Sequence, residues 1–149
     1  MMSTRPILLA EDSADDQLLI QRSLKKSNIT NPILIANDGV EALDCLFGTG
    51  DYAGNGPVRP AVVLLDMKMP RLGGLDVLER IRKQPETRHI PVVILTSSDE
   101  EQDMLRSYDL GANSYVRKPV DFKEFAEAVG KLGLYWVLLN EAPPEIRSE

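Results

Sequence analysis

Short apolar runs without a polar break recur along the chain, and amphipathic segments separate them. The clearest runs lie at 7–10, 61–65 and 92–95, and weaker ones lie at 33–36 and 114–117. Runs of this length are typical of strands that are covered on both faces, as in parallel sheets. Because a segment with helical spacing follows each run, the pattern predicts five strand–helix repeats. The expected fold class is α/β, a parallel sheet with helices on both of its faces.

The segments between the runs predict helices that end at a turn-forming residue. Gly48, Gln84-Pro85 and Gly111 close three of them, and Ser27-Asn28 closes the first. The expected apolar residues of the five helices are Leu18, Leu19 and Leu24; Val40, Leu43 and Phe47; Leu75, Leu78 and Ile81; Met104, Leu105 and Tyr108; and Phe122, Phe125, Ala126, Val129 and Leu132.

The length of the chain, 149 residues, suits one domain with a substantial core. We expect this domain to extend over residues 1–140, followed by a short tail at 141–149 in which Pro143-Pro144 favours fraying. Residues 48–60 are rich in Gly and Pro, and we interpret them as an extended loop before the third strand.

Composition excludes several classes of protein. The net charge of -6 argues against a surface that holds nucleic-acid phosphates, which requires clustered Lys and Arg. No apolar run is long enough for a signal peptide or a membrane span. The single cysteine, Cys45, excludes an intramolecular disulfide and is most simply a small buried apolar residue. We therefore expect a cytoplasmic protein without a nucleic-acid or membrane partner.

Polar residues with chemical potential stand where the apolar runs end. Glu11 and Asp12 follow the first run, Asp66 closes the third, Thr96 closes the fourth and Lys118 follows the fifth. The carboxyl ends of parallel strands meet at one edge, and ligands of open sheets bind beyond that edge. Three carboxylates, a hydroxyl and an ammonium are thus expected in one small place.

Three neighbouring carboxylates repel one another unless a cation shares their site. Mg²⁺ suits such a site, because it accepts carboxylate oxygens and leaves room for phosphate oxygens. Lys118 can pair with Asp66 or with a phosphoryl oxygen, and the Thr96 hydroxyl can donate to the same oxygen. This set predicts phosphoryl transfer with Asp66 as the nucleophile, forming an acyl phosphate.

Each of these residues alone has a simpler interpretation. Glu11-Asp12 is more often a helix start, Asp66 a turn residue, Thr96 a helix cap and Lys118-Pro119 an ordinary loop dipeptide. Their joint occurrence at successive strand ends, in this order, favours the functional interpretation.

Five motifs together resemble the receiver domain of bacterial two-component systems over about residues 6–132. They are Glu11-Asp12, Asp66 in LLDMKMP, Gly73-Gly74, Thr96 in VVILTSS, and Lys118-Pro119. The resemblance implies a flavodoxin-like fold with strand order 2-1-3-4-5 and five helices. It also implies a phosphoacceptor signalling protein, not an enzyme, in which a sensor histidine kinase phosphorylates Asp66 from a phosphohistidine.

Roles for individual residues follow from the same resemblance. The metal ligands would be Asp12, Asp66 and the main-chain carbonyl of Lys68, with Glu11 reaching the Mg²⁺ ion through water. Thr96 and Tyr115 match a pair that rearranges on phosphorylation, although Tyr115 can also be an ordinary aromatic of an edge strand. Lys68 and Ser98 occupy variable positions that tune the lifetime of the phosphoryl group. Lys118-Pro119 matches a dipeptide whose peptide bond is usually cis.

A narrower resemblance concerns regulators paired with phytochrome-type histidine kinases. It depends on the EDSADD start, the loop at 48–60 and the Leu134-Tyr135-Trp136 ending. Those regulators are single-domain proteins that tend to dimerise. Apolar residues surround the predicted last helix, and we expect a homodimer or partner surface there, although this segment can instead fold back on its own domain. The surface residues would be Tyr135, Trp136, Leu138 and Leu139.

No output domain is expected after the receiver, so the protein would act by binding another protein, by passing its phosphoryl group onward or as a phosphoryl sink. The only histidine, His89, precedes the fourth strand and is assigned no role.

Three alternatives were considered. A flavin-binding electron carrier needs a hydroxyl- and glycine-rich loop where this chain has Glu11-Asp12. A haloacid-dehalogenase-like phosphatase needs a second aspartate at the position of Lys68. A scaffold with an inactive pocket is the third.

Overall fold

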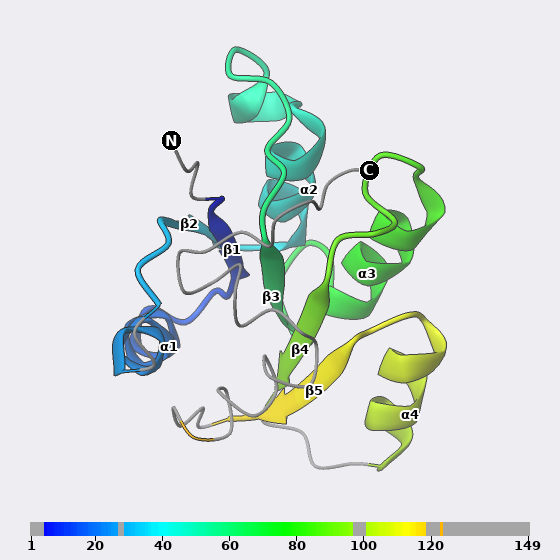
Figure 1. The fold of residues 1–149 in the computed structure, drawn as a ribbon. Helices are drawn as coiled ribbons and strands as arrows, with labels where there is room; N and C mark the ends of the chain where they lie inside the picture. The colour runs from blue at the N-terminus through cyan, green and yellow to red at the C-terminus, as the bar shows by residue number, and fades with distance from the viewer. Residues whose placement is uncertain (1–4, 27–28, 97–100, 119–122, 124–149) are drawn as a thin grey trace, which may run out of the picture.

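Five parallel strands form a single sheet in the order β2-β1-β3-β4-β5 (Figure 1). The computed structural model describes residues 5–26, 29–96, 101–118 and 123. The strands are β1 (Ile7–Ala10), β2 (Ile33–Ala36), β3 (Val62–Asp66), β4 (Val92–Thr96) and β5 (Ser114–Arg117). Each lies where an apolar run predicted it, and the strand order implied by the resemblance is confirmed.

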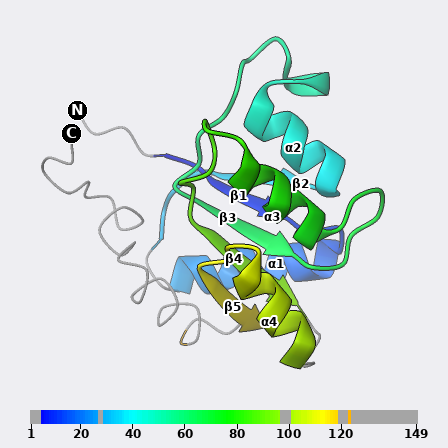
Figure 2. The same cartoon turned by 90° about the vertical axis from the view of Figure 1, so that its right-hand side faces the viewer.

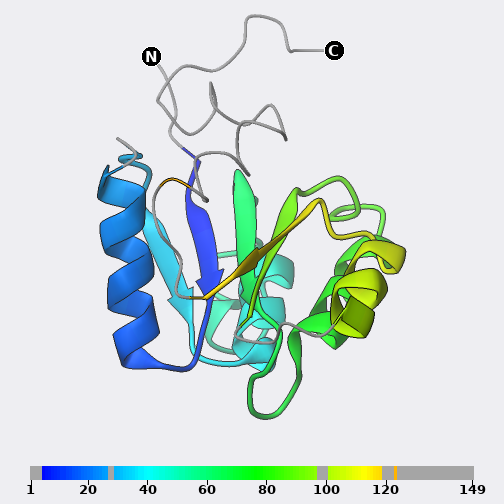
Figure 3. The same ribbon diagram turned by 90° about the horizontal axis from the view of Figure 1, so that it is seen from below.

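Helices cover both faces of the sheet. They are α1 (Ala14–Lys26), α2 (Gly39–Phe47), α3 (Gly74–Lys83) and α4 (Glu101–Asp109), with a 3₁₀ turn, η1 (Gly50–Tyr52), after α2. Figure 3 shows α1 on one side of the sheet, and Figure 2 looks onto the side that carries α2, α3 and α4. The predicted fifth helix, around residues 122–132, lies outside the described residues except for residue 123.

The strands form because their side chains are buried on both sides. All four residues of β1 are fully buried, and alternate residues enter different halves of the core. Ile7 and Leu9 pack with Ile20 and Leu24 of α1. The residues between them, Leu8 and Ala10, pack with α2 and α3. The two halves hold the carboxyl ends of β1 and β3 side by side.

Local capping signals define the limits of α2. Its N-cap, Asp38, accepts a 2.8 Å hydrogen bond from the amide of Glu41. The helix ends at Gly48, whose φ of 69° lies in the left-handed region that glycine adopts without strain. The predicted ends at Gly48 and before Pro85 are therefore confirmed.

Some of the predicted apolar positions face outward. Leu18 and Leu19 on α1 and Leu105 and Tyr108 on α4 are each 45% exposed or more, and Met104 is also exposed. On α1 the buried apolar residues are Ile20 and Leu24, so the helix is rotated relative to the face centred on Leu18 and Leu19. The sequence therefore predicted where α1 lies along the chain, but not which of its faces is buried.

The long loop is tied to the helix before it. The amide of Val58 donates to the carbonyl of Cys45 at 3.0 Å, and η1 makes one turn of helix within the loop. Cys45 itself is fully buried, which raises the pKa of its thiol, as expected for a packing residue. None of the helices in the described ranges has the length and apolar character to cross a membrane. The domain limits of 1–140 remain a prediction.

Candidate functional site

The carboxylates of Glu11, Asp12 and Asp66 converge beyond the ends of β1 and β3. Each offers an oxygen that lies within 4.8 Å of the other two. Ala10 pairs with Leu65 in the sheet, so the residues that follow them, Glu11 and Asp66, come side by side. Glu11 and Asp66 are buried, whereas Asp12 is exposed. The predicted convergence of these three side chains is present in the structure.

Lys118 enters the same place from the end of β5. Its Nζ lies 2.7 Å from Glu11 Oε1, 2.9 Å from Asp16 Oδ2 and 3.5 Å from Asp66 Oδ1. The Lys118 amide also donates to the carbonyl of Thr96 at 2.8 Å, which ties its backbone to the end of β4. Only 12% of the Lys118 side chain is exposed, and its ammonium is held among three carboxylates.

Burial and charge act in opposite directions on the two central groups. Burial, helped by the Glu11 charge, raises the pKa of Asp66 to about 6, against the lowering effects of Lys118 and of the Lys68 amide. Burial alone would lower the pKa of Lys118, but hydrogen bonds to Glu11 and Asp16 and the nearby Asp66 charge raise it above its ordinary value. The ammonium therefore stays charged, while Asp66 is an incompletely compensated carboxylate.

The segment after Asp66 turns back sharply, and Gly74 makes this turn possible. The Gly74 amide donates to the carbonyl of Met67 at 2.9 Å. A Cβ at Gly74 would collide with the main-chain oxygen of Asp66 and lie 2.9 Å from Met67 Cα. Gly73 has more room, with its nearest neighbour 3.4 Å away. Of the glycine pair noted in the sequence, Gly74 is the position that the geometry restricts.

The same segment is attached to the start of α2. Arg71 binds Asp38 with two hydrogen bonds, of 2.8 and 3.2 Å, and Arg71 has a positive φ of 66°. This pair joins the loop after β3 to the N-cap of α2. The main chain of Lys68 lies next to Asp66, because its amide hydrogen-bonds to that carboxylate. The predicted role of the Lys68 carbonyl as a metal ligand stays a prediction.

Thr96 and Tyr115 lie on the two strands beyond Asp66. Thr96 is 1% exposed at the end of β4, one residue after the Leu95 that pairs with Asp66. Tyr115 is half-buried on β5 and packs against the core on the side of α2 and α3. Both are placed on the strands that end at the site, and their role as a switch remains a prediction.

Other predicted residues lie elsewhere or are not described. His89 is exposed in the connection before β4, away from the strand ends that carry the carboxylates. Ser98, Pro119, Tyr135, Trp136, Leu138 and Leu139 lie outside the described residues. One contact was missed: Asp16, in the first turn of α1, binds Lys118. Its place in the first turn after a strand end was the signal available for finding it.

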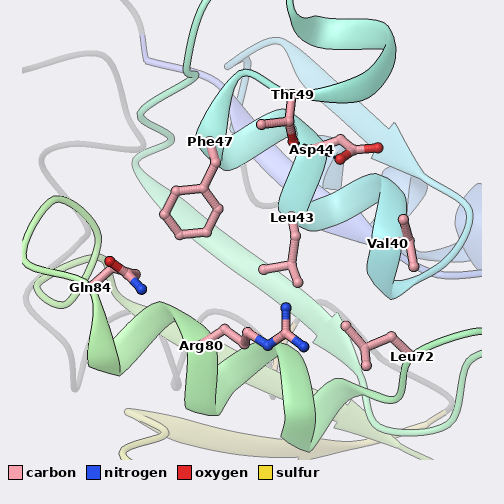
Figure 4. Close-up of a pocket in the computed structure, with 8 residues that line it drawn as sticks. All are labelled: Val40, Leu43, Asp44, Phe47, Thr49, Leu72, Arg80 and Gln84. Carbon is pink, nitrogen blue, oxygen red and sulfur yellow. Dashed lines mark hydrogen bonds between the residues drawn. The ribbon is translucent and has the colours of Figure 1, made fainter.

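A separate groove of about 550 Å³ lies between α2 and α3 (Figure 4). It shares no residue with the carboxylate cluster. The groove is lined by Val40, Leu43, Asp44, Phe47, Thr49, Leu72, Arg80 and Gln84.

The donor set at the strand ends fits a hard divalent cation. The side-chain ligands found among the described residues are carboxylate oxygens from Glu11, Asp12 and Asp66, the type that Mg²⁺ and Mn²⁺ prefer. Lys118 offsets part of their charge but is shared with Asp16. Burial, with the Glu11 charge, raises the pKa of Asp66, and a bound cation would favour the ionised form of that carboxyl group.

Comparison with known proteins agrees with this geometry. Residues 7–130 match the response regulator receiver domain family. The response regulator Rcp1 of Synechocystis sp. is 39% identical over 131 residues, which cover 88% of each chain. A crystal structure of the Mn²⁺-bound form of Rcp1 covers 95% of this chain and 99% of its own, with a TM-score of 0.75 and 38% identity.

Two further solved structures are similar over nearly the whole chain. The bacteriophytochrome response regulator AtBRR is 50% identical with a TM-score of 0.83, covering 94% of this chain and all of its own. The phosphorylated cyanobacterial phytochrome response regulator RcpA is 33% identical with a TM-score of 0.76, covering 96% and 100%. With the sheet order, the strand-end carboxylates and Lys118 in place, the chain belongs to the response regulator receiver domain family.

Proposed function

We propose that this response regulator accepts a phosphoryl group from a sensor histidine kinase onto Asp66, in a reaction that requires Mg²⁺. The observation that carries the proposal is the convergence of Glu11, Asp12 and Asp66 within 4.8 Å, with the Lys118 ammonium beside them. The phosphorylated state of the related RcpA supports the same chemistry.

In the proposed reaction an oxygen of Asp66 attacks the phosphorus of a phosphohistidine. An O–P bond forms, the P–N bond breaks, and the imidazole leaves with the bonding electrons and takes up a proton. Bound Mg²⁺ would neutralise charge on the carboxylates and on the phosphoryl oxygens. Lys118 would pair with one phosphoryl oxygen and the Thr96 hydroxyl would donate to another. The chain thus supplies the nucleophile and the charge neutralisation.

Replacing the acceptor tests this proposal. Asp66→Asn keeps the shape of the side chain but removes the nucleophilic oxygen. With Mg²⁺ and a small-molecule phosphodonor, intact mass spectrometry is expected to show one added phosphoryl group on the unmodified protein and none on Asp66→Asn. Asp76→Asn, an exposed aspartate of α3, serves as the control and should be labelled normally. Labelling retained by Asp66→Asn would identify another acceptor.

The metal would be held by Asp12, Asp66 and the main-chain carbonyl of Lys68, with Glu11 reaching it through water. The Mn²⁺-bound form of the related Rcp1 supports binding of a divalent ion by this chain. We infer Mg²⁺ as the resident ion because small hard cations accept a few carboxylates together with phosphate oxygens.

Phosphorylation would shift an existing equilibrium between two states through Thr96 and Tyr115. A preference of about 3 to 5 kcal/mol for the active state is enough to make a minor state the major one. Charge-assisted bonds from Lys118 and Thr96 to the phosphoryl oxygens are of the right size.

The partners that we propose follow from the relatives. AtBRR is a bacteriophytochrome response regulator and RcpA a phytochrome response regulator, so a phytochrome-type kinase in the cytoplasm is the proposed phosphodonor. The proposed homodimer would use Tyr135, Trp136, Leu138 and Leu139. Sedimentation of Trp136→Ala is expected to show loss of a dimer that the unmodified protein forms, and an unchanged sedimentation coefficient would remove this assignment.

A further inference from the structure

The Lys118 ammonium binds carboxylates on the side of the strand-end site nearest α1. Its three N–H donors meet Glu11 Oε1 at 2.7 Å, Asp16 Oδ2 at 2.9 Å and Asp66 Oδ1 at 3.5 Å. Charge-assisted hydrogen bonds of ammonium groups normally span about 2.7 to 2.9 Å. The first two contacts are therefore full hydrogen bonds, and the contact to Asp66 is longer and weaker.

The start of α1 holds Asp16 in place for this contact. The Asp16 amide donates to Ser13 Oγ at 3.3 Å, and the Ser13 amide donates to Glu11 Oε2 at 3.0 Å. The Glu11 main-chain oxygen in turn accepts a 2.6 Å hydrogen bond from Gln17 Nε2. Glu11, Ser13, Asp16 and Gln17 are thus linked by hydrogen bonds, which fix the main chain of Asp16 beside the end of β1 and within reach of Lys118.

We propose that Asp16 is a positioning residue that restrains Lys118 on the α1 side of the pocket and so limits its contact with Asp66 and with a phosphoryl group carried there. This inference rests on the proposed function. Of the two carboxylates that bind the ammonium most closely, Glu11 belongs to the predicted Glu11-Asp12 pair, whereas Asp16 lies only in the wider EDSADD segment and had no predicted role. Asp16 is also the more exposed, at 34% against 1% for the side chain, which makes it the partner that Lys118 can exchange most readily.

The restraint by Asp16 is expected to slow phosphorylation of Asp66 and to speed loss of the phosphoryl group. A phosphoryl group on Asp66 adds negative charge and strong acceptor oxygens, and it competes with Asp16 for the same ammonium. Removing the Asp16 charge frees one N–H donor of Lys118 and lowers the negative potential that an incoming phosphodonor meets. Both effects favour uptake of the phosphoryl group, and the first also slows its loss.

The experiment compares Asp16→Asn with the unmodified protein and with Asp15→Asn. Asp15 is the exposed neighbour on α1, so its substitution removes the same charge without touching Lys118. Labelling with a small-molecule phosphodonor and Mg²⁺ is followed by intact mass, and loss of label is followed after the donor is removed. Asp16→Asn is expected to label about fivefold faster and to lose label about fivefold more slowly. Asp15→Asn should match the unmodified protein.

Two further measurements separate positioning from a general effect on folding. Asp16→Glu, which keeps the charge, should restore both rates toward the original values. In a metal-free crystal structure of Asp16→Asn, the Lys118 Nζ–Asp66 Oδ1 distance is expected to shorten from 3.5 Å toward about 2.8 Å. An unchanged distance with unchanged rates, or slower labelling by a folded Asp16→Asn, overturns the inference.

These outcomes differ from failure of the proposed function. If the unmodified protein takes up no phosphoryl group, or Asp66→Asn is still labelled, the proposed function itself is wrong. If Asp66 is labelled and Asp16→Asn behaves as the unmodified protein, only the role of Asp16 is wrong.

Discussion

Two aspartates of this chain show how surroundings decide what a side chain does. Burial and the Glu11 charge raise the pKa of Asp66, which leaves that carboxylate in need of a cation. Asp38 lies near the surface, and the Arg71 guanidinium, together with backbone amides of α2, lowers its pKa. Asp66 lies in the carboxylate cluster at the strand ends, while Asp38 attaches the loop after β3 to a helix start.

Asp38→Ala removes a helix cap together with an ion pair, and we expect it to reduce the free energy of unfolding at pH 7 by about 1 kcal/mol. Because the folded-state pKa of Asp38 is depressed, its stabilisation is fully present above the unfolded-state pKa and is lost as the pH falls through the folded-state value. Urea unfolding should therefore show a difference between variant and parent at pH 7 that shrinks well below pH 4.

Asp38→Asn is the matched control, since asparagine also caps helices but carries no charge for Arg71. Its loss of stability should be smaller than that of Asp38→Ala. Equal losses for both variants at pH 7 would mean that the cap hydrogen bond contributes nothing.

Individual contacts of this kind were only partly predictable. Glu11, Asp66 and Lys118 could be brought together from the sequence because strand ends in a parallel sheet share one edge. The position of Asp16 in the first turn after a strand end was a signal, but its contact with Lys118 depends on the rotation of α1, and the Arg71 contact depends on a loop residue with positive φ. The spacing of apolar residues and the strand order determine which helices and strands meet. Predicting individual side-chain contacts also requires the backbone conformation of the loops between them.

At the scale of elements, Arg82 joins three segments that the sheet alone would not connect. From the end of α3 it donates to the carbonyls of Gly111, Arg88 and Ile90 at 2.9, 3.0 and 2.7 Å, and to Asn113 Oδ1 at 2.8 Å. These acceptors lie before β4 and between α4 and β5. Burial lowers the pKa of the guanidinium, so these hydrogen bonds must offset a cost of desolvation.

Arg82→Ala leaves these acceptors without their donor, and we expect a loss of about 2 to 3 kcal/mol in the free energy of unfolding. Arg82→Lys should recover only part of it, because an ammonium cannot reproduce the planar fork of donors. Chemical denaturation measures both variants.

Lys83→Ala, at the exposed neighbouring position with a surface pair to Glu79, is the control and should change stability little. A similar loss for Lys83→Ala would show that general helix effects, and not the acceptors of Arg82, account for the result.

At the scale of the whole molecule, the sheet order places the candidate ligands at one edge, and this was the most predictable property of the chain. Runs without polar alternation limit the fold to a buried parallel sheet, and its topology then locates the site. Which residues of α4 are exposed and where the domain ends were harder to predict from the sequence. Both depend on which surfaces remain in contact with water.

Mg²⁺ should stabilise the whole fold, because binding to the native carboxylates also relieves their repulsion. At a concentration 100 times its dissociation constant, a ligand that binds only the native state adds about 2.7 kcal/mol of stability. We expect the thermal midpoint to rise with added Mg²⁺ and to return to its original value with a chelator.

In Asp12→Asn the rise with Mg²⁺ should be much smaller, because one of the clustered carboxylates is gone. Asp76→Asn, on the surface of α3, should behave as the parent protein does. A full response to Mg²⁺ in Asp12→Asn would place the ion elsewhere.

The two carboxylate oxygens of Glu11 accept hydrogen bonds from residues that lie far apart in the sequence. Oε1 accepts from Lys118 beyond β5, and Oε2 accepts from the Ser13 amide just before α1. A ligand that draws Lys118 away from Glu11 would therefore change the environment of the carboxylate that also binds the residue before α1. We therefore expect a ligand that binds Lys118 to shift the start of α1 as well, and a spectroscopic label near residue 14 should report that shift.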